Sequence, residues 1–163
     1  MTHPPFLLIS PFLVQAIVIS VDEFYFHRKR GLPGWELLSH PLDTLCLLGC
    51  FAFALTQSYN PMNIKIYIGL CVLSSLLVTK DEAVHRRVCS AAECWLHSIL
   101  FLIHPVVLMD VAVLWKDSLD KSSVPQERTA LLILISAAFL FLLYQITSAL
   151  LTRRNFHESF ERT

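Results

Sequence analysis

Carboxylate and imidazole side chains gather at, or just inside, the ends of the apolar segments of this chain. Ionisable groups at membrane depth are costly, so they usually face a protein interior, pair with one another or serve a function. Their types suit metal binding, because iron, manganese and zinc accept imidazole and carboxylate ligands. Five histidines and six acids share this placement: Asp22, Glu23, His27, His40, Asp43, Asp81, Glu82, His85, Glu93, His97 and His104.

Local spacing places several of these groups on shared helix faces. Side chains three or four residues apart lie on one face of an α-helix. In the segment that begins near Glu93, the stripe formed by Glu93 and His97 continues to His104 within a sector about 40° wide. The pairs with this spacing are Glu23 and His27, Asp81 and His85, Glu82 and His85, and Glu93 and His97.

The pattern predicts a metal site for one or two ions. Carboxylate-bridged di-iron centres in helix bundles use a Glu from two helices and a Glu-x-x-His pair from two others. This chain has one such pair, Glu82 with His85, so the match is partial. The predicted ligands are Glu23, His27, Glu82, His85, Glu93 and His97. The groups predicted to support them, for example by orienting imidazoles, are Asp22, His40, Asp43, Asp81 and His104.

Other polar residues have a simpler interpretation. Glu36 is predicted to be an ordinary surface group. The five cysteines fall within or beside apolar segments, which favours packing as small apolar side chains over disulfides or an iron–sulfur cluster. Nearby lysines and arginines also allow a metal-free interpretation, in which the acids form solvated ion pairs at the membrane boundary.

Apolar runs of membrane length must position these side chains. Of the 163 residues, 55% are hydrophobic and 16% charged, whereas soluble domains are roughly a quarter charged. A spanning helix needs about 20 mostly apolar residues. The sequence predicts a single all-α membrane domain over residues 1–163, a polytopic bundle of five transmembrane helices. The spans are expected at about residues 6–26, 41–57, 63–79, 90–115 and 129–152.

Lysine and arginine placement predicts the orientation. With five spans, nine of these residues fall on one side of the membrane and four on the other. The richer side is expected to be cytoplasmic, which puts the N-terminus outside and the C-terminus inside an inner or plasma membrane. In this topology four consecutive helix ends bring their acids and histidines to one cytoplasmic level.

Together these features predict a metal-dependent integral membrane enzyme with its site at the cytoplasmic face. With iron, the expected activity is that of a di-iron oxidoreductase of lipid metabolism, a hydroxylase or desaturase acting on a membrane lipid or another apolar small molecule. With zinc, the same groups would activate water for lipid hydrolysis. The sequence does not single out a catalytic residue, and short spans are compatible with a homo-oligomer.

Three other hypotheses stay open at this stage. A carrier or channel subunit could relay protons or bind a cation, but it requires ionisable groups throughout the membrane depth, and only His104 is clearly deep. A bis-histidine haem protein needs partners at matching depth, and an assembly subunit would dock another protein through its charged belt. Zero net charge argues against a nucleic-acid partner, and the sequence has no nucleotide-binding fingerprint. The closely spaced histidine boxes expected of membrane fatty-acid desaturases are missing too.

Overall fold

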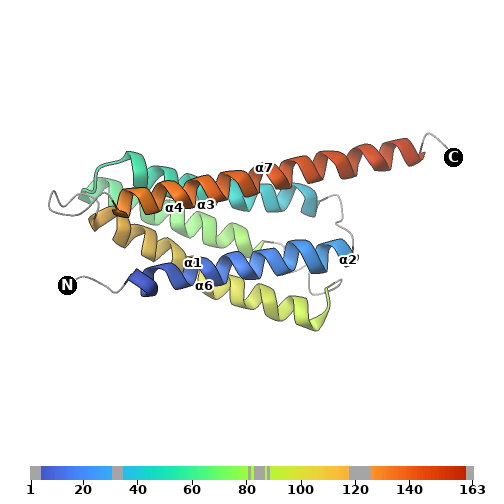
Figure 1. Ribbon diagram of the computed structural model, residues 1–163, viewed down its shortest axis with the longest axis horizontal. Coiled ribbons are helices and arrows are strands. Elements are labelled where there is room, and N and C mark those ends of the chain that lie inside the picture. Colours follow the sequence, from blue (N-terminus) through green and yellow to red (C-terminus); the bar gives the residue numbers. More distant parts are fainter. Residues whose placement is uncertain are drawn as a thin grey trace.

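Long helices separated by short turns make up the described chain. The computed structural model describes residues 5–30, 35–80, 82, 87, 89–117 and 126–160. In that part of the chain there is no strand, which confirms the predicted all-helical class. The elements are α1 (Pro5–Val21), the π-helix η1 (Asp22–His27), α2 (Arg28–Arg30), α3 (Glu36–Thr56), α4 (Pro61–Thr79), α6 (Ala91–Asp117) and α7 (Gln126–Phe160). Helices α1, η1 and α2 follow one another directly and form one long rod (Figure 1).

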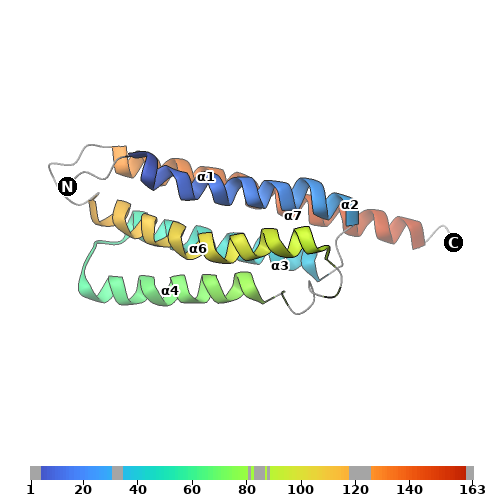
Figure 2. The same cartoon turned by 90° about the horizontal axis from the view of Figure 1, so that it is seen from below.

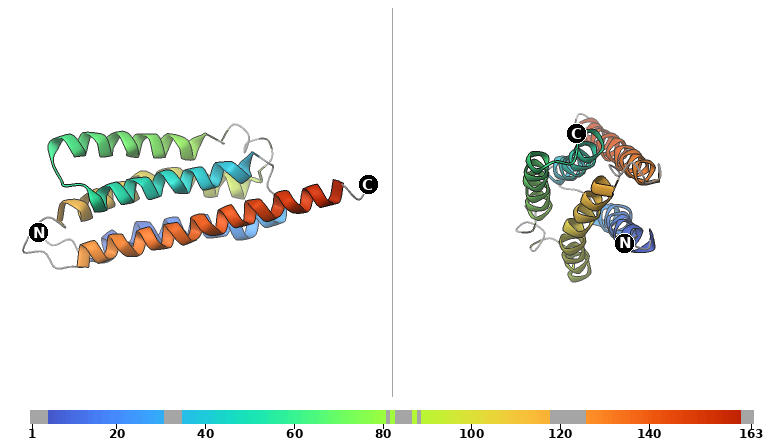
Figure 3. Two further views of the ribbon diagram at one scale, coloured as in Figure 1. Left: turned by 90° about the horizontal axis from the view of Figure 1, so that it is seen from above. Right: turned by 90° about the vertical axis from the view of Figure 1, so that its left-hand side faces the viewer.

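The helices form a bundle of three layers (Figure 2). Helix α4 is one outer layer, α3 and α6 are the middle layer, and α1 and α7 are the other outer layer, an order that the end view of Figure 3 also shows. The contacts agree, because α1 packs mainly on α6, whereas α7 packs mainly on α3. The two outer helices α1 and α7 therefore rest on different middle helices.

Five helical segments are long and apolar enough to cross a membrane. They are Ile9–His27, Glu36–Thr56, Pro61–Thr79, Ala91–Asp117 and Arg128–Thr152. Large apolar side chains cover their outer faces, including Leu13, Ile17, Leu102 and Leu140. Helices that are apolar on the outside as well as the inside are typical of proteins surrounded by lipid. The predicted bundle of five membrane-length helices is confirmed.

Helix α3 begins earlier than predicted. Residue 41 was the expected start, because proline is favoured in a first helical turn and disfavours the helical conformation of the preceding residue. The helix instead begins at Glu36 and holds Pro41 inside it. The carbonyl of Trp35 accepts the first backbone hydrogen bonds of this added turn. The early start carries Glu36 into the bundle.

Aromatic side chains fill the bundle near the turn between α3 and α4. The ring of Trp115 lies 5.0 Å from that of Tyr59 and 5.4 Å from that of Tyr67, measured between centroids. The Trp115 indole N–H donates to the Gln57 carbonyl at 2.7 Å, and the Tyr67 hydroxyl donates to the Leu108 carbonyl at 2.9 Å. Because their polar atoms are satisfied, these large rings are stably buried.

Candidate metal centre

Three helix ends meet at the end of the bundle where α7 finishes, and each contributes acids and histidines (Figure 1). Burying so many ionisable groups is costly unless they are paired or bind a metal. Six of them are less than a tenth exposed, and His40 is half-buried. The groups are Asp22, Glu23 and His27 from η1, Glu36 and His40 from α3, and Glu93 and His97 from α6.

The π-helical turn η1 determines which acid faces the histidine on its own rod. In an ordinary α-helix, residues five apart point about 140° away from each other. The wider π turn, in which hydrogen bonds join residues five apart, instead places Asp22 and His27 on one face. Short π segments frequently occur at functional sites, and this one lies where α1 reaches the ionisable cluster.

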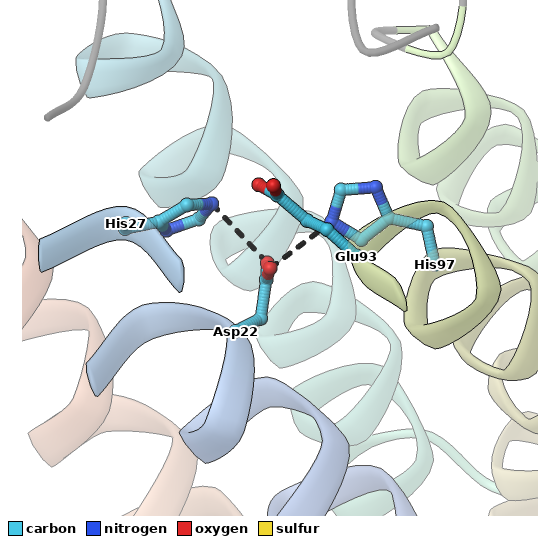
Figure 4. A group of neighbouring side chains, drawn as sticks. All are labelled: Asp22, His27, Glu93 and His97. Carbon is cyan, nitrogen blue, oxygen red and sulfur yellow. Dashed lines mark hydrogen bonds and ion pairs between the residues drawn. The ribbon is translucent and has the colours of Figure 1, made fainter. Parts of the chain in front are cut away.

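Asp22 lies between two imidazoles (Figure 4). Its Oδ1 atom is 3.1 Å from His97 Nε2, and its Oδ2 atom is 3.3 Å from His27 Nε2. The other ring nitrogen of His27, Nδ1, lies 3.3 Å from Glu23 Oε2. The carboxylate of Glu93 lies beside the same two imidazoles. One residue of η1 thus connects its own helix to α6.

These side chains form two adjoining groups whose ligand atoms lie close enough together to share a metal ion. In the first, Asp22, His27, Glu93 and His97 each offer one ligand atom, and all four atoms lie within 4.8 Å of one another. In the second, His27, Glu36 and His40 meet the same criterion. The rings of His27 and His40 lie 4.7 Å apart between centroids. The Nε2 atom of His40 is buried, and among the described residues it has no hydrogen-bond partner.

The start of helix α6 fixes Glu93. The sequence Ser90-Ala91-Ala92-Glu93 has the form of a capping box, in which each end of the motif binds the backbone N–H of the other. The Glu93 N–H donates to Ser90 Oγ at 3.3 Å, and the Ser90 N–H donates to Glu93 Oε2 at 3.4 Å. The motif therefore fixes the Glu93 side chain at the start of α6.

The structure brings three of the six predicted ligands into one group. These are His27, Glu93 and His97. Glu23 contacts His27 from the side but is not in either group. Glu82 is half-buried and also outside both groups, and His85 lies outside the described residues.

The predicted supporting residues are divided in the same way. Asp22 and His40 are in the two groups, and Asp81 lies outside the described residues. Asp43 instead forms an ion pair with Lys80, whose Nζ lies 2.6 and 2.7 Å from the two carboxylate oxygens. His104 lies deeper, with Nε2 3.0 Å from Ser74 Oγ and Nδ1 3.3 Å from Gln15 Nε2.

The prediction that Glu36 is a surface group is wrong. Its exposed fraction is 0%, and it is in the second group. The sequence carried a usable signal, since Glu36 precedes His40 by the same four residues that separate Glu23 from His27 and Glu93 from His97. Because Pro41 predicts a helix start beyond Glu36, the sequence does not indicate that Glu36 and His40 share a helix.

The comparisons with known proteins add no relative. No protein family model, curated protein or solved structure matches this chain.

Proposed function

We propose that this protein is a metal-dependent membrane enzyme in which Asp22, His27, Glu93 and His97 hold an ion. The observation that carries the proposal is the convergence of four buried ligand atoms within 4.8 Å of one another. Ligands of a tetrahedral zinc ion, bound at about 2.0–2.1 Å, lie about 3.3 Å from each other. Asp22 Oδ1 lies 3.1 Å from His97 Nε2, and Asp22 Oδ2 lies 3.3 Å from His27 Nε2, so each carboxylate oxygen is close to that spacing from one imidazole.

The residue types of the cluster also suit a bound cation. The cluster holds four carboxylates and three imidazoles, which are ligands that iron and zinc accept. Carboxylates bind such an ion in their ionised form, and imidazoles bind it in their neutral form.

The second group favours two iron ions over a single zinc ion. Glu36 and His40 adjoin the first group through His27, and the two oxygens of Asp22 face different imidazoles, as in a carboxylate that bridges two ions. Such a pair, when bound, activates dioxygen. A hydroxylation would use dioxygen and an external two-electron donor, placing one oxygen atom into a C–H bond and releasing the other as water.

Zinc-dependent hydrolysis is the second candidate function. The four ligand atoms of the first group would complete a tetrahedral site, and closed zinc sites of this kind are structural, because catalysis needs a position for water. One of the four side chains must therefore leave the zinc for hydrolysis to occur. Iron accepts more ligands, so we favour the oxidoreductase.

A lipid or another apolar molecule is the proposed substrate. The cluster lies at one end of five membrane-length helices, and the positive-inside rule assigns that end to the cytoplasmic face of an inner or plasma membrane. An apolar substrate can reach this site from the bilayer, whereas the electron donor would approach from water.

Metal analysis of the detergent-purified protein tests the first part of the proposal. We expect stoichiometric iron or zinc, and its loss in the double variant Glu93→Ala/His97→Ala. Asp110→Ala is a matched control, because Asp110 is a half-buried acid on the same helix that is in neither group. Wild-type protein with no more metal than the double variant would contradict the proposal.

Lipid analysis tests the enzymatic part. We expect lipids from cells that produce the wild type, but not from cells that produce the double variant, to contain a product with one added oxygen atom or two fewer hydrogen atoms. Hydrolysed lipids would favour the zinc enzyme instead. A metal-loaded protein that changes no lipid would contradict both enzymes and favour a cation carrier.

A further inference from the structure

A small polar chamber adjoins the ionisable cluster inside the bundle. Its volume is about 70 Å³, and its lining includes Asp22, His40 and His97. A cavity needs only about 10–15 Å³ to hold a water molecule, so the chamber has room for a small polar group. On the side away from the cluster, the lining continues with Gln15 and Thr44.

A larger apolar pocket continues from this chamber. Its volume is about 200 Å³, and the two cavities share five lining residues. The shared residues are Gln15, Ile19, Thr44, Leu47 and Phe141. Beyond them the wall is apolar, with Val107 and Leu134 among its side chains. A polar compartment at the cluster thus joins an apolar compartment that runs toward the middle of the bundle.

Two phenyl rings line the apolar pocket at the end away from the cluster. They belong to Phe12 and Phe51, and they meet edge to face with centroids 6.3 Å apart. Three residues separate Phe12 from Gln15 on α1, which corresponds to about 4.5 Å along the axis. The pocket therefore fits a short chain better than a long chain or a bulky ring system.

The side of the pocket faces lipid between α1 and α7. These two helices rest on different middle helices, and small side chains line the pocket where they face each other: Ala16 and Ser20 on α1, Ala137 and Ala138 on α7. Ala16, Ser20 and Ala137 are exposed. Because both helices are long enough to span the membrane, this opening is surrounded by hydrocarbon chains.

A buried side-chain oxygen that lines both cavities indicates which polar group a bound molecule would carry. Gln15 is 5% exposed and lines both cavities, and its Oε1 has no hydrogen-bond partner among the described residues. A buried amide oxygen of this kind needs a donor. A carboxylate has no proton to donate, so an anionic group of this kind would leave Gln15 Oε1 unsatisfied. A neutral hydroxyl or amide N–H fits best.

We infer that the substrate is a neutral, single-chain amphiphile, such as a short-chain alcohol, that enters sideways between α1 and α7. Its chain lies in the apolar pocket with the methyl end at Phe12 and Phe51, and its polar end donates to Gln15 Oε1 beside the cluster. Lipid chains are as apolar as the pocket, so shape and the polar end determine selection. This inference deepens the proposed function and rests on it for the reaction at the polar end.

Photo-crosslinking in phosphatidylcholine vesicles tests this inference. The probe is a short-chain primary alcohol with a diazirine near its methyl end, and the labelled residues are found by mass spectrometry of the full-length protein. We expect label on Phe12, Phe51 or Val107, reduced about tenfold, or 1.4 kcal/mol, by Ala138→Trp. The matched control is Leu140→Trp, since Leu140 is 66% exposed on the same helix and does not line the pocket.

Further measurements separate the outcomes. Gln15→Leu should lower the labelling by the alcohol severalfold but leave the weaker labelling by the corresponding fatty acid unchanged. A variant counts as folded when its metal content and thermal unfolding equal those of the wild type. If Ala138→Trp does not fold, the smaller substitution Ala138→Leu replaces it. Equal label on the lipid-facing Leu13 and Ile17, insensitive to Ala138→Trp, would overturn the inference and leave the metal proposal standing. Pocket labelling of a metal-free wild-type protein would instead overturn the proposed function.

Discussion

At the scale of single residues, Asp22 is the junction of the cluster. Each of its carboxylate oxygens faces a different imidazole, one on η1 and one on α6. Glu23, its neighbour, contacts only one of these imidazoles, at His27 Nδ1. The two acids therefore have different roles, although they are adjacent in the sequence. In the proposed site Asp22 would bind the ions, and Glu23 would orient one of the imidazoles that bind them.

This difference gives a prediction for two amide variants. Asp22→Asn removes the charge that would bridge the two ions of the proposed site, so we expect the variant to lose its metal on purification. Glu23→Gln keeps a hydrogen-bond acceptor near His27, so we expect metal affinity to fall by about 10–100-fold, the usual effect of disturbing a group behind a ligand. Metal titration of the two apoproteins measures this. Equal losses in both variants would contradict the assigned roles.

The ion pair of Asp43 and Lys80 gives a second prediction at this scale. Both side chains are less than a fifth exposed, so removal of one partner leaves a poorly solvated charge. We expect Lys80→Met to lower the free energy of unfolding by about 3 kcal/mol. The double variant Asp43→Leu/Lys80→Met should recover most of that loss. Unfolding titrations in detergent micelles provide the measurement, and an additive double variant would show that the pair is not coupled.

At the scale of elements, the ends of the helices place the ligands. The π turn of η1 aligns Asp22 with His27, the early start of α3 brings in Glu36, and the capping box of α6 holds Glu93. The π turn, the early helix start and the capping box each lie in the first or last turn of a helix. Backbone groups there lack helical partners, so local geometry can vary. Side chains in the middle of a regular helix could not be adjusted in this way.

The capping box can be tested separately from the metal. Ser90→Ala removes one of its two hydrogen bonds, and we expect the free energy of unfolding to fall by about 1 kcal/mol, whereas Ser90→Asp should retain most of the stability. Ser98→Ala is the control, because that hydroxyl only bonds the Cys94 carbonyl within the same helix. If both alanine variants have the same stability, the capping box does not stabilise the start of α6.

At the scale of the whole molecule, the bundle has two unlike ends. The ionisable cluster occupies the end where α7 finishes, and the aromatic side chains around Trp115 fill the region near the turn between α3 and α4. Between them the polar lining stops at Gln15, His104 and Ser74. Polar lining that stops inside the bundle fits an enzyme better than a carrier, because a carrier needs a polar path to both sides of the membrane.

The orientation of the protein in the membrane is the prediction at this scale. In a cysteine-free background, Ser58→Cys lies in the turn before α4, and Lys29→Cys lies beside the cluster. Both positions are exposed. If the cluster is cytoplasmic, a membrane-impermeant maleimide added to intact cells should label position 58 and not position 29. The reverse pattern would contradict the orientation predicted from the positive-inside rule, and it would move the electron donor to the other side.

Several features of this molecule could be predicted from the sequence for a definite reason. Hydropathy over about 20 residues is a local quantity, so the membrane-length helices can be predicted from composition along the chain. The spacing rule for one helix face also placed Glu93 and His97 together, because α6 is regular at that point. Glu23 was preferred over Asp22 because the same rule assumes an α-helix, and η1 is not one.

The sequence by itself determined an all-helical, membrane-length bundle whose acids and histidines gather at helix ends, because those properties depend on neighbours in the chain. Only the tertiary structure decided which of these groups meet. The partners Asp22 and His97, 75 residues apart, are joined by packing of α1 on α6, and the burial of Glu36 depends on where α3 begins. Side chains from five long helices line the chamber beside them. Its position therefore depends on how those helices pack, which local sequence patterns do not specify.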